Sequence, residues 1–130
     1  MNIDDDEVRE WLSYASDDLA YGKLGIEDIP RASAWSFQQS SEKALKALWL
    51  QTYEEIPRTH DVAFLLTELA KKFEITEEVR DAVLVLAEIT PAVRYPSDDQ
   101  TQITKEEALR YAEAAHEVFH WVSHQRARTQ

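Results

Sequence analysis

Residues 30–53 read PRASAWSFQQSSEKALKALWLQTY, with apolar side chains recurring every three or four positions. That spacing is typical of a helix that buries one of its faces. Pro30 suits the first turn of a helix, because a backbone N–H has no intrahelical partner there. The apolar face of this segment consists of Ala34, Phe37, Ala44, Leu45 and Leu48, interrupted by Ser41. We therefore predict a helix over this whole segment.

Four further blocks show the same periodicity on either side of this helix. They cover about residues 4–21, 60–73, 76–90 and 104–122. Thr104 and Glu107 form a capping-box pattern at the start of the last block. Turn residues are few, with two glycines and four prolines, and no segment alternates with period two. The sequence predicts one all-α domain over residues 1–130 with its core in about 8–122, an antiparallel up-and-down bundle of four long helices plus a shorter one.

The composition excludes several functional classes. The chain has 130 residues, of which 14 are basic and 25 acidic, so its net charge is −11. Such a chain repels polyanions on average, which disfavours a membrane-surface role and restricts nucleic-acid binding to a local basic site. Cysteine is absent, which excludes disulfides and thiolate metal sites. Because there is no long apolar run and Met1–Arg9 is acidic, we expect a cytoplasmic protein that does not contact membranes.

The predicted helix over residues 30–53 carries a local basic excess within this acidic chain. Arg31, Lys43 and Lys46 outnumber Glu42. Gln39, Lys43 and Lys46 are separated by steps of four and three, which places them on one face. That face offers an amide and two ammonium groups to a phosphate or a base.

Two further pairs complete the candidate ligand site. His60 and Asp61 open the third helical block, where a histidine can relay a proton and nearby N–H groups favour an anion. Arg94 and Tyr95 lie in the long connection of residues 90–103, and offer a guanidinium for phosphate and an aromatic face. If these segments converge on the basic helix, they form a site for a polyanion.

The same residues also have purely structural explanations. In that interpretation His60 caps its helix, Asp61 complements the helix dipole, and the lysines are solvated surface. Arg94 then pairs with a carboxylate such as Glu42. The four tryptophans are expected to anchor the core or a dimer interface rather than to stack on bases: Trp11, Trp35, Trp49 and Trp121.

Several short motifs follow one another along the chain in a specific order. They are Trp11, Ala15 and Asp18-Leu19; Phe37-Gln38-Gln39, Glu42-Lys43-Ala44 and Lys46-Ala47-Leu48; His60-Asp61; and Arg94-Tyr95-Pro96. Together, over about residues 8–122, they resemble the HEPN domain family, the "higher eukaryote and prokaryote nucleotide-binding" helical bundles. The resemblance implies a bundle of four to five helices that homodimerises.

From this resemblance we expect a module that homodimerises and binds a nucleotide, a minimal nucleotidyltransferase partner or both, within a two-component system of the toxin–antitoxin type. Two alternatives stay open. One is a metal-independent ribonuclease toxin, as some family members are, with His60 as general base and Arg94 stabilising the transition state. The other is a purely structural protein-interaction module whose charge attracts a basic partner. The prediction leans away from an enzyme, and no cofactor is expected.

Ribonucleases of the HEPN family carry an arginine followed a few residues later by a histidine, near a helix end. The equivalent pair here is Arg110 and His116, but Tyr111 stands where a polar residue is usual and both lie inside the last predicted helix. At about 100° per residue they are about 120° apart around that helix, so they share no face. We therefore do not expect them to form a nuclease site.

The last helix also contains a ladder of histidines. His116, His120 and His124 are spaced by four, and Glu113 and Glu117 each precede a histidine by three. Helical pairs of this kind bind zinc, or a di-iron centre when neighbouring helices add carboxylates. Because no other predicted helix supplies a matching set, the sequence predicts no native metal site here.

Overall fold

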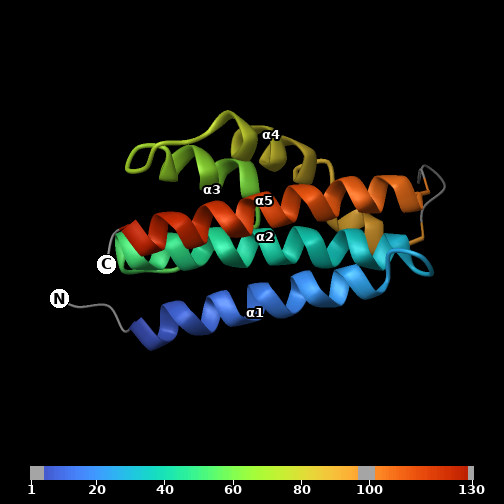
Figure 1. The fold of residues 1–130 in the computed structure, drawn as a ribbon, viewed down its shortest axis with the longest axis horizontal. Coiled ribbons are helices and arrows are strands. Elements are labelled where there is room, and N and C mark those ends of the chain that lie inside the picture. Colours follow the sequence, from blue (N-terminus) through green and yellow to red (C-terminus); the bar gives the residue numbers. More distant parts are fainter. Residues whose placement is uncertain (1–4, 97–101, 129–130) are drawn as a thin grey trace.

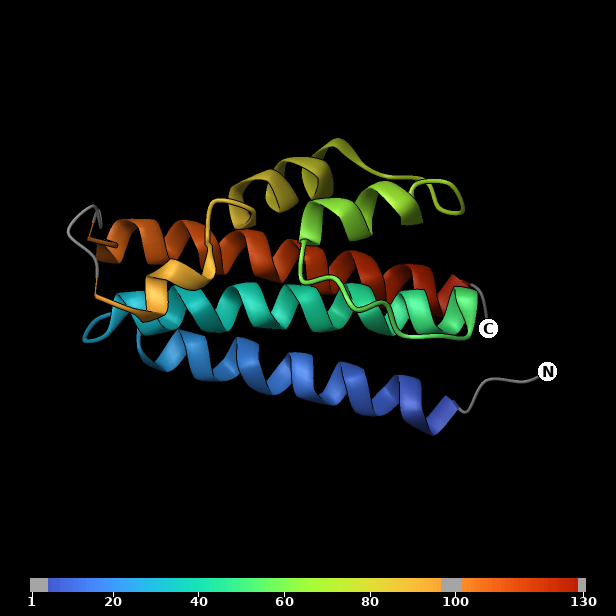
Figure 2. The same cartoon turned by 180° about the vertical axis from the view of Figure 1, so that it is seen from behind.

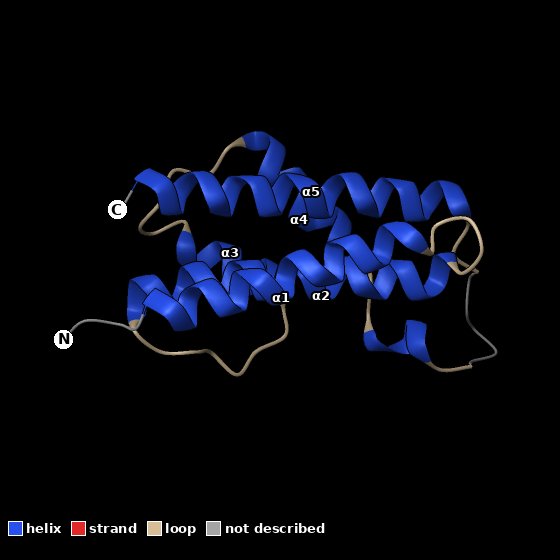
Figure 3. Ribbon diagram, turned by 60° about the horizontal axis from the view of Figure 1, so that its bottom comes forward, coloured by secondary structure: helices blue, strands red, loops and turns tan. Residues whose placement is uncertain are grey.

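The computed structural model describes residues 5–96 and 102–128. Within these ranges it contains five α-helices, one 3₁₀ helix and no strand. The elements are α1 (Asp5–Leu24), α2 (Pro30–Tyr53), α3 (Val62–Leu69), α4 (Glu77–Leu86), η1 (Pro91–Arg94) and α5 (Lys105–Arg128). Figure 3 shows this all-helical composition, which confirms the predicted fold class.

Three helices are long, rather than the predicted four, and lie side by side, while the shorter α3 and α4 pack on α2 and α5 and do not reach α1 (Figure 1). Helices α1 and α2 are antiparallel neighbours, and α5 packs along α2 (Figure 1). Residues 54–61, the return segment, run back along α2 before α3 begins (Figure 2). This path brings the start of α3 against the middle of α2 rather than against its end.

The hydrophobic core lies where α2 meets the other helices. All five residues of the predicted apolar face of α2 are buried, each with at most 1% exposure, and this confirms the prediction. Large, fully buried partners come from α3, α4 and α5: Leu65, Leu69, Leu86, Val118 and Val122. Among the helices described, none is both long enough and apolar enough to cross a lipid bilayer.

Hydrogen bonds to side chains cap the first turns of α3, α4 and α5. The Asp61 carboxylate accepts the N–H groups of Ala63 and Phe64 at 3.0 and 3.2 Å, at the start of α3. Thr104 and Glu107 bond reciprocally at the start of α5, through N–H···O distances of 3.1 and 3.2 Å. This exchange satisfies two backbone donors that a helix leaves unpaired, and it confirms the predicted capping box.

Helix α1 lies close against α2 where Gly22 faces the ring of Phe37. A Cβ atom at Gly22 would lie 2.6 Å from Cε1 of Phe37, well inside van der Waals contact. The Phe37 ring is fully buried, so it has no free space into which to move. Glycine is therefore required here by the proximity of the two helices.

We expect Gly22→Ala to lower the free energy of unfolding by about 1–2 kcal/mol. Overpacking costs about 1–3 kcal/mol, while alanine returns up to about 1 kcal/mol of helix propensity. Urea denaturation followed by circular dichroism measures the difference. Ser13→Ala, on the exposed side of the same helix, is the matched control and should change stability by less than about 0.5 kcal/mol. A Gly22→Ala variant as stable as that control would contradict the close contact.

Candidate functional site

Three polar side chains of α2 are buried in one row that faces the return segment. Gln38, Glu42 and Lys46 follow one another at intervals of four, and each residue is only 5% exposed. The Lys46 ammonium donates to Oε2 of Glu42 at 3.1 Å, and Nε2 of Gln38 donates to Oε1 of Glu42 at 3.4 Å. The Glu42 carboxylate is therefore the acceptor at the centre of this buried cluster.

His60 lies over this row at the end of the return segment. Its Nδ1 is 2.9 Å from Oε2 of Glu42, while 79% of its side chain is exposed. Nε2 of Gln38 also donates to the backbone carbonyl of His60 at 3.4 Å. A carboxylate bonded to one ring nitrogen orients an imidazole and leaves the other nitrogen for a ligand or a proton. Glu42 thus holds His60 with its Nε2 side towards solvent.

The surroundings of Glu42 set its ionisation. Burial by itself raises the pKa of this carboxyl group, but hydrogen bonds from His60, Lys46 and Gln38 and the charge of Lys46 hold the pKa below its ordinary value of 4.5. Because the folded-state pKa lies below the unfolded one, ionised Glu42 stabilises the fold above about pH 4.5. That contribution is lost as the pH falls through the folded-state pKa.

A cavity of about 410 Å³ opens beside this cluster. It is bounded by α2, the start of α3 and the segment that leads into η1. Its lining residues are Trp35, Gln38, His60, Asp61, Val62, Ala63, Leu86, Ala87, Ile89, Thr90 and Pro91. The sequence analysis expected the helix over residues 30–53, the start of the next helix and the long connection of residues 90–103 to converge, and these three segments meet at this cavity. The helix cap, however, is Asp61 and not His60, because the Asp61 carboxylate accepts the first N–H groups of α3.

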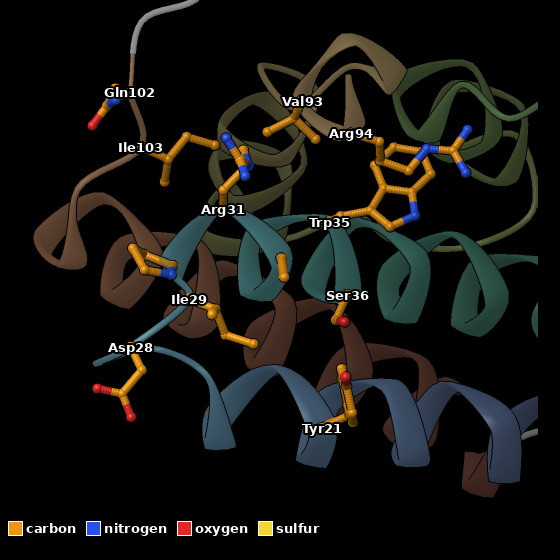
Figure 4. A pocket seen from close by; sticks show the side chains of 12 residues that line it. Tyr21, Asp28, Ile29, Arg31, Trp35, Ser36, Val93, Arg94, Gln102 and Ile103 are labelled. Carbon is orange, nitrogen blue, oxygen red and sulfur yellow. The ribbon is translucent and has the colours of Figure 1, made fainter. Parts of the chain in front are cut away.

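Trp35 lines this cavity and also a larger one of about 680 Å³. In the larger cavity Arg94 lies against the indole of Trp35, with its Cζ 4.4 Å from the ring centroid (Figure 4). Arg31 lines the same cavity from the first turn of α2. Within residues 5–96 and 102–128 neither arginine forms an ion pair. The suggestion that Arg94 pairs with Glu42 was therefore wrong, because Arg94 stacks on Trp35 instead.

The other predicted ligand residues are divided between two sides of α2. Lys46 belongs to the Glu42 cluster, whereas the Lys43 ammonium is 2.6 Å from a carboxylate oxygen of Asp18 on α1. Nε2 of Gln39 donates to Oε1 of Gln38 at 2.7 Å. Tyr95 is 61% exposed and its ring lies 5.5 Å from Cζ of Arg94, but Tyr95 lines neither cavity. The structure thus brings Gln39, Lys46, His60 and Asp61 together and separates Lys43 from them.

Sequence reasoning missed several residues that build the site. Gln38 and Glu42 form a row with Lys46 at intervals of four, a spacing that places them on one helical face and could have been noticed. Trp35 was expected only as a core or dimer-interface anchor, and no local pattern links it to Arg94, which is far away in the chain. Arg31 was noted as part of the basic excess but was not placed in the ligand site.

A family model described as "HEPN domain" matches residues 8–125. The chain belongs to the HEPN domain family. The resemblance drawn from the ordered motifs is thereby confirmed. A comparison with curated proteins finds no match.

Solved structures agree with this HEPN assignment. TT1696 from Thermus thermophilus is similar with a TM-score of 0.80 and 24% identity, over 90% of this chain and 96% of that chain. A HEPN domain protein from Thermotoga maritima, tm0613, has 28% identity and a TM-score of 0.73, over 92% of this chain and 98% of that chain. ST0689, an archaeal HEPN homologue, has 23% identity and a TM-score of 0.73, over 91% of this chain and 96% of that chain.

Arg110 and His116, the two residues of this HEPN domain that most resemble the family's ribonuclease motif, have side chains on different parts of the surface. The Arg110 guanidinium donates to both carboxylate oxygens of Glu88, at 3.1 and 3.3 Å. His116 instead lines a groove of about 540 Å³ between α1 and α5. The pair therefore lies outside both cavities beside Trp35, and its two side chains have separate surroundings.

The histidine ladder of the HEPN domain lies along the same groove. His116 and His120 line it together with Glu113 and Glu117, while His124 is exposed further along α5. Across the part of the chain that the structure describes, no three histidine or carboxylate side chains are placed to hold one metal ion. The Glu42 cluster and the two cavities beside Trp35 are the stronger candidate site.

Proposed function

We propose that this HEPN domain binds a nucleotide in the cavity lined by Arg31, Trp35 and Arg94. The observation that carries the proposal is a pair of arginines that line one cavity of an acidic protein and form no ion pair within the described chain. Guanidinium groups bind phosphate oxygens through paired hydrogen bonds, and an indole offers a stacking face for a base. A cavity of about 680 Å³ lies within the usual size range of small-molecule sites.

The smaller cavity supplies the polar groups of the proposed site. His60 and Gln38 line it, and both are held by Glu42 through the contacts described above. Because Trp35 borders both cavities, a phosphate beside the arginines lies next to the donors and acceptors of the Glu42 cluster. We place the sugar or base of the nucleotide on this side of the indole.

The proposal includes assembly. We propose that the domain homodimerises in the cytoplasm and pairs with a minimal nucleotidyltransferase protein in a two-component system of the toxin–antitoxin type, as the family resemblance implies. Trp11 is partly exposed and lies outside the two cavities beside Trp35, so it is available for such contacts. Light scattering of the purified chain measures its mass directly. A strictly monomeric chain at micromolar concentration would contradict the dimer.

We expect Arg94→Gln to abolish most of the thermal stabilisation that a nucleotide confers. A hydrogen bond to a charged group contributes about 1.5–3 kcal/mol, which corresponds to a loss of affinity of about tenfold or more. Thermal denaturation with ATP, GTP and AMP titrated up to millimolar concentration measures the effect, because a ligand that binds only the folded state raises the melting temperature.

Arg110→Gln is the matched control for that measurement. It removes the same charge from an arginine that is 53% exposed and paired with Glu88, outside both cavities. Its melting temperature should rise with nucleotide as much as that of the parent chain. Equal nucleotide responses of Arg94→Gln and the parent would refute binding at this cavity.

A second candidate function is a metal-independent ribonuclease, favoured by the 2.9 Å contact between Glu42 and His60. The carboxylate orients the imidazole so that its exposed nitrogen can accept a proton from an attacking hydroxyl group. Attack of that hydroxyl oxygen on phosphorus displaces the neighbouring nucleotide's 5′ oxygen, which takes up a proton, and Arg94 stabilises the negative charge on the phosphoryl oxygens of the phosphorane-like transition state. This activity would use the same pair of cavities as the nucleotide.

Expression of the chain in a bacterium tests the ribonuclease candidate. We expect growth arrest with RNA cleavage in the parent, and at least about a hundredfold lower cleavage in His60→Ala, the magnitude of losing a general base. His116→Ala is the control and should cleave like the parent, because His116 lies in a separate groove. Intact RNA at high expression of the parent would refute the ribonuclease function and would not affect the proposal of nucleotide binding.

A further inference from the structure

One face of α1 presents large apolar and acidic side chains that stay exposed, and Lys43 of α2 borders it, with its ammonium 5.9 Å from the ring centroid of Tyr14. Six exposed positions recur at alternating steps of three and four, and we name them the α1 seam. They are Glu7, Glu10, Tyr14, Asp17, Tyr21 and Leu24. Tyr14, Tyr21 and Leu24 are 58%, 61% and 83% exposed, so three of the largest exposed apolar residues of the protein lie on one stripe.

The position of α1 in the bundle leaves this stripe open. Helix α1 lies at the outer edge of the bundle, with α2 on one side and solvent on the other (Figures 1 and 2). Its opposite face is occupied, because Val8, Ala15, Leu19 and Gly22 are buried against the bundle. At about 100° per residue the α1 seam is centred on the far side of the helix from these residues.

The seam has the geometry of a contact between helices. Its apolar residues Tyr14, Tyr21 and Leu24 are seven and three positions apart, a spacing that keeps them on one face, as in helices that pack along one another at a shallow angle. Beside the seam, Glu10, Trp11, Tyr14 and Lys43 line a hollow of about 260 Å³ that can receive a side chain of a partner. A stripe of this length matches a partner helix of several turns rather than a small ligand.

The charge of the seam selects the partner. Three of the six positions are carboxylates and none is Lys or Arg. A second copy of this chain, with a net charge of −11, would bring the same carboxylates against an acidic surface. A helix with lysine or arginine beside its apolar stripe would pair with Glu7, Glu10 and Asp17 and cover Tyr14, Tyr21 and Leu24.

We propose that the α1 seam docks a basic amphipathic helix of another protein. Tyr21 belongs to the seam and also lines the nucleotide cavity, whereas Tyr14, Leu24 and the three carboxylates of the seam lie outside that lining, so variants of these residues test the seam separately from the cavity. The partner is defined by its chemistry, namely an apolar helical stripe flanked by cationic side chains.

The probe for the test is a fluorescein-labelled synthetic peptide of about 20 residues, long enough to follow α1. It carries leucine at alternating steps of three and four, with lysine on both flanks of that stripe. A second peptide has glutamate in place of each lysine. Fluorescence anisotropy should show binding of the lysine peptide and none of the glutamate peptide.

Two double variants of the seam locate the binding. One double variant combines Tyr14→Ala with Leu24→Ala, and the other combines Glu10→Gln with Asp17→Asn. We expect each to lower the affinity for the lysine peptide by about tenfold or more. Glu78→Gln with Asp81→Asn is the matched control, since it removes the same two charges from exposed positions on α4, across the bundle from α1 (Figure 1). The control should change affinity by less than about twofold.

Four results would overturn the proposal. They are equal binding of the glutamate peptide, an equal loss in the α4 control, no loss in Tyr14→Ala with Leu24→Ala, or conversion of a dimer of this chain to monomers by the seam variants. The last would assign the seam to a second copy. Unchanged melting temperatures and an unchanged nucleotide response of both seam variants show that the fold and the Arg94 cavity are intact, so failure here is distinct from failure of the proposed function.

Discussion

Lys46→Met is expected to lower the free energy of unfolding by about 3 kcal/mol, because it leaves the buried Glu42 carboxylate without its ammonium partner. Removal of one member of a buried ion pair costs about 3–5 kcal/mol. We expect the lower end of that range, since His60 and Gln38 still donate to Glu42. Urea denaturation at pH 7 measures the change.

Two further variants test whether burial is the reason for this loss. Combining Lys46→Met with Glu42→Leu should recover most of the lost stability, because an apolar pair of similar volume has no uncompensated charge. Lys71→Met is the surface comparison, since Lys71 is 65% exposed and pairs with Glu68 one turn away. It should cost less than about 1 kcal/mol. Equal losses in Lys46→Met and Lys71→Met would show that the buried cluster contributes no more than a surface pair.

Phe37→Ala is expected to lower the free energy of unfolding by about 3–5 kcal/mol. Its ring is fully buried between α1 and the core, and its removal leaves a cavity that the neighbouring helices can only partly close. The midpoint and slope of urea denaturation measure the loss, and an unchanged slope shows that the change lies in stability rather than in compactness.

The contact between Phe37 and Gly22 makes a second expectation possible. In the Phe37→Ala background, Gly22→Ala should become neutral or stabilising, because the ring that excludes a Cβ atom is gone. The double-mutant cycle therefore yields a coupling free energy of about 1 kcal/mol or more. A Gly22→Ala cost that is the same in both backgrounds would mean that the glycine is needed for some other reason.

Local patterns in the sequence were sufficient to predict most of the helical architecture. The segment of residues 30–53 is a helix with the expected bounds and the expected buried face. The helix predicted over residues 60–73 is shorter, covering Val62–Leu69. It begins later because Asp61 is its cap, and it ends earlier because Lys71 and Lys72 bond to carbonyls three residues back, a tighter turn than an α-helix.

The candidate site was predictable only in its parts. The side-chain chemistry of His60, Asp61 and Arg94 can be recognised from the sequence alone. The structure places these residues around Trp35 and the Glu42 cluster. Their arrangement depends on the return segment, which runs back along α2 instead of leaving it (Figure 2). No local pattern encodes that path, because it follows from how α3 packs on α2. The same path explains why Lys46 joins His60 while Lys43 pairs with Asp18 on α1.

The position of Trp35 has a thermodynamic consequence. Because one indole borders two cavities, a ligand that turns the ring in either cavity changes the shape of the other. The contacts that a nucleotide makes in one cavity would then be coupled to those it makes in the other, and the coupling would be reciprocal. A change in the phosphate of the nucleotide would thereby alter how tightly its sugar or base is bound, through the position of a single side chain.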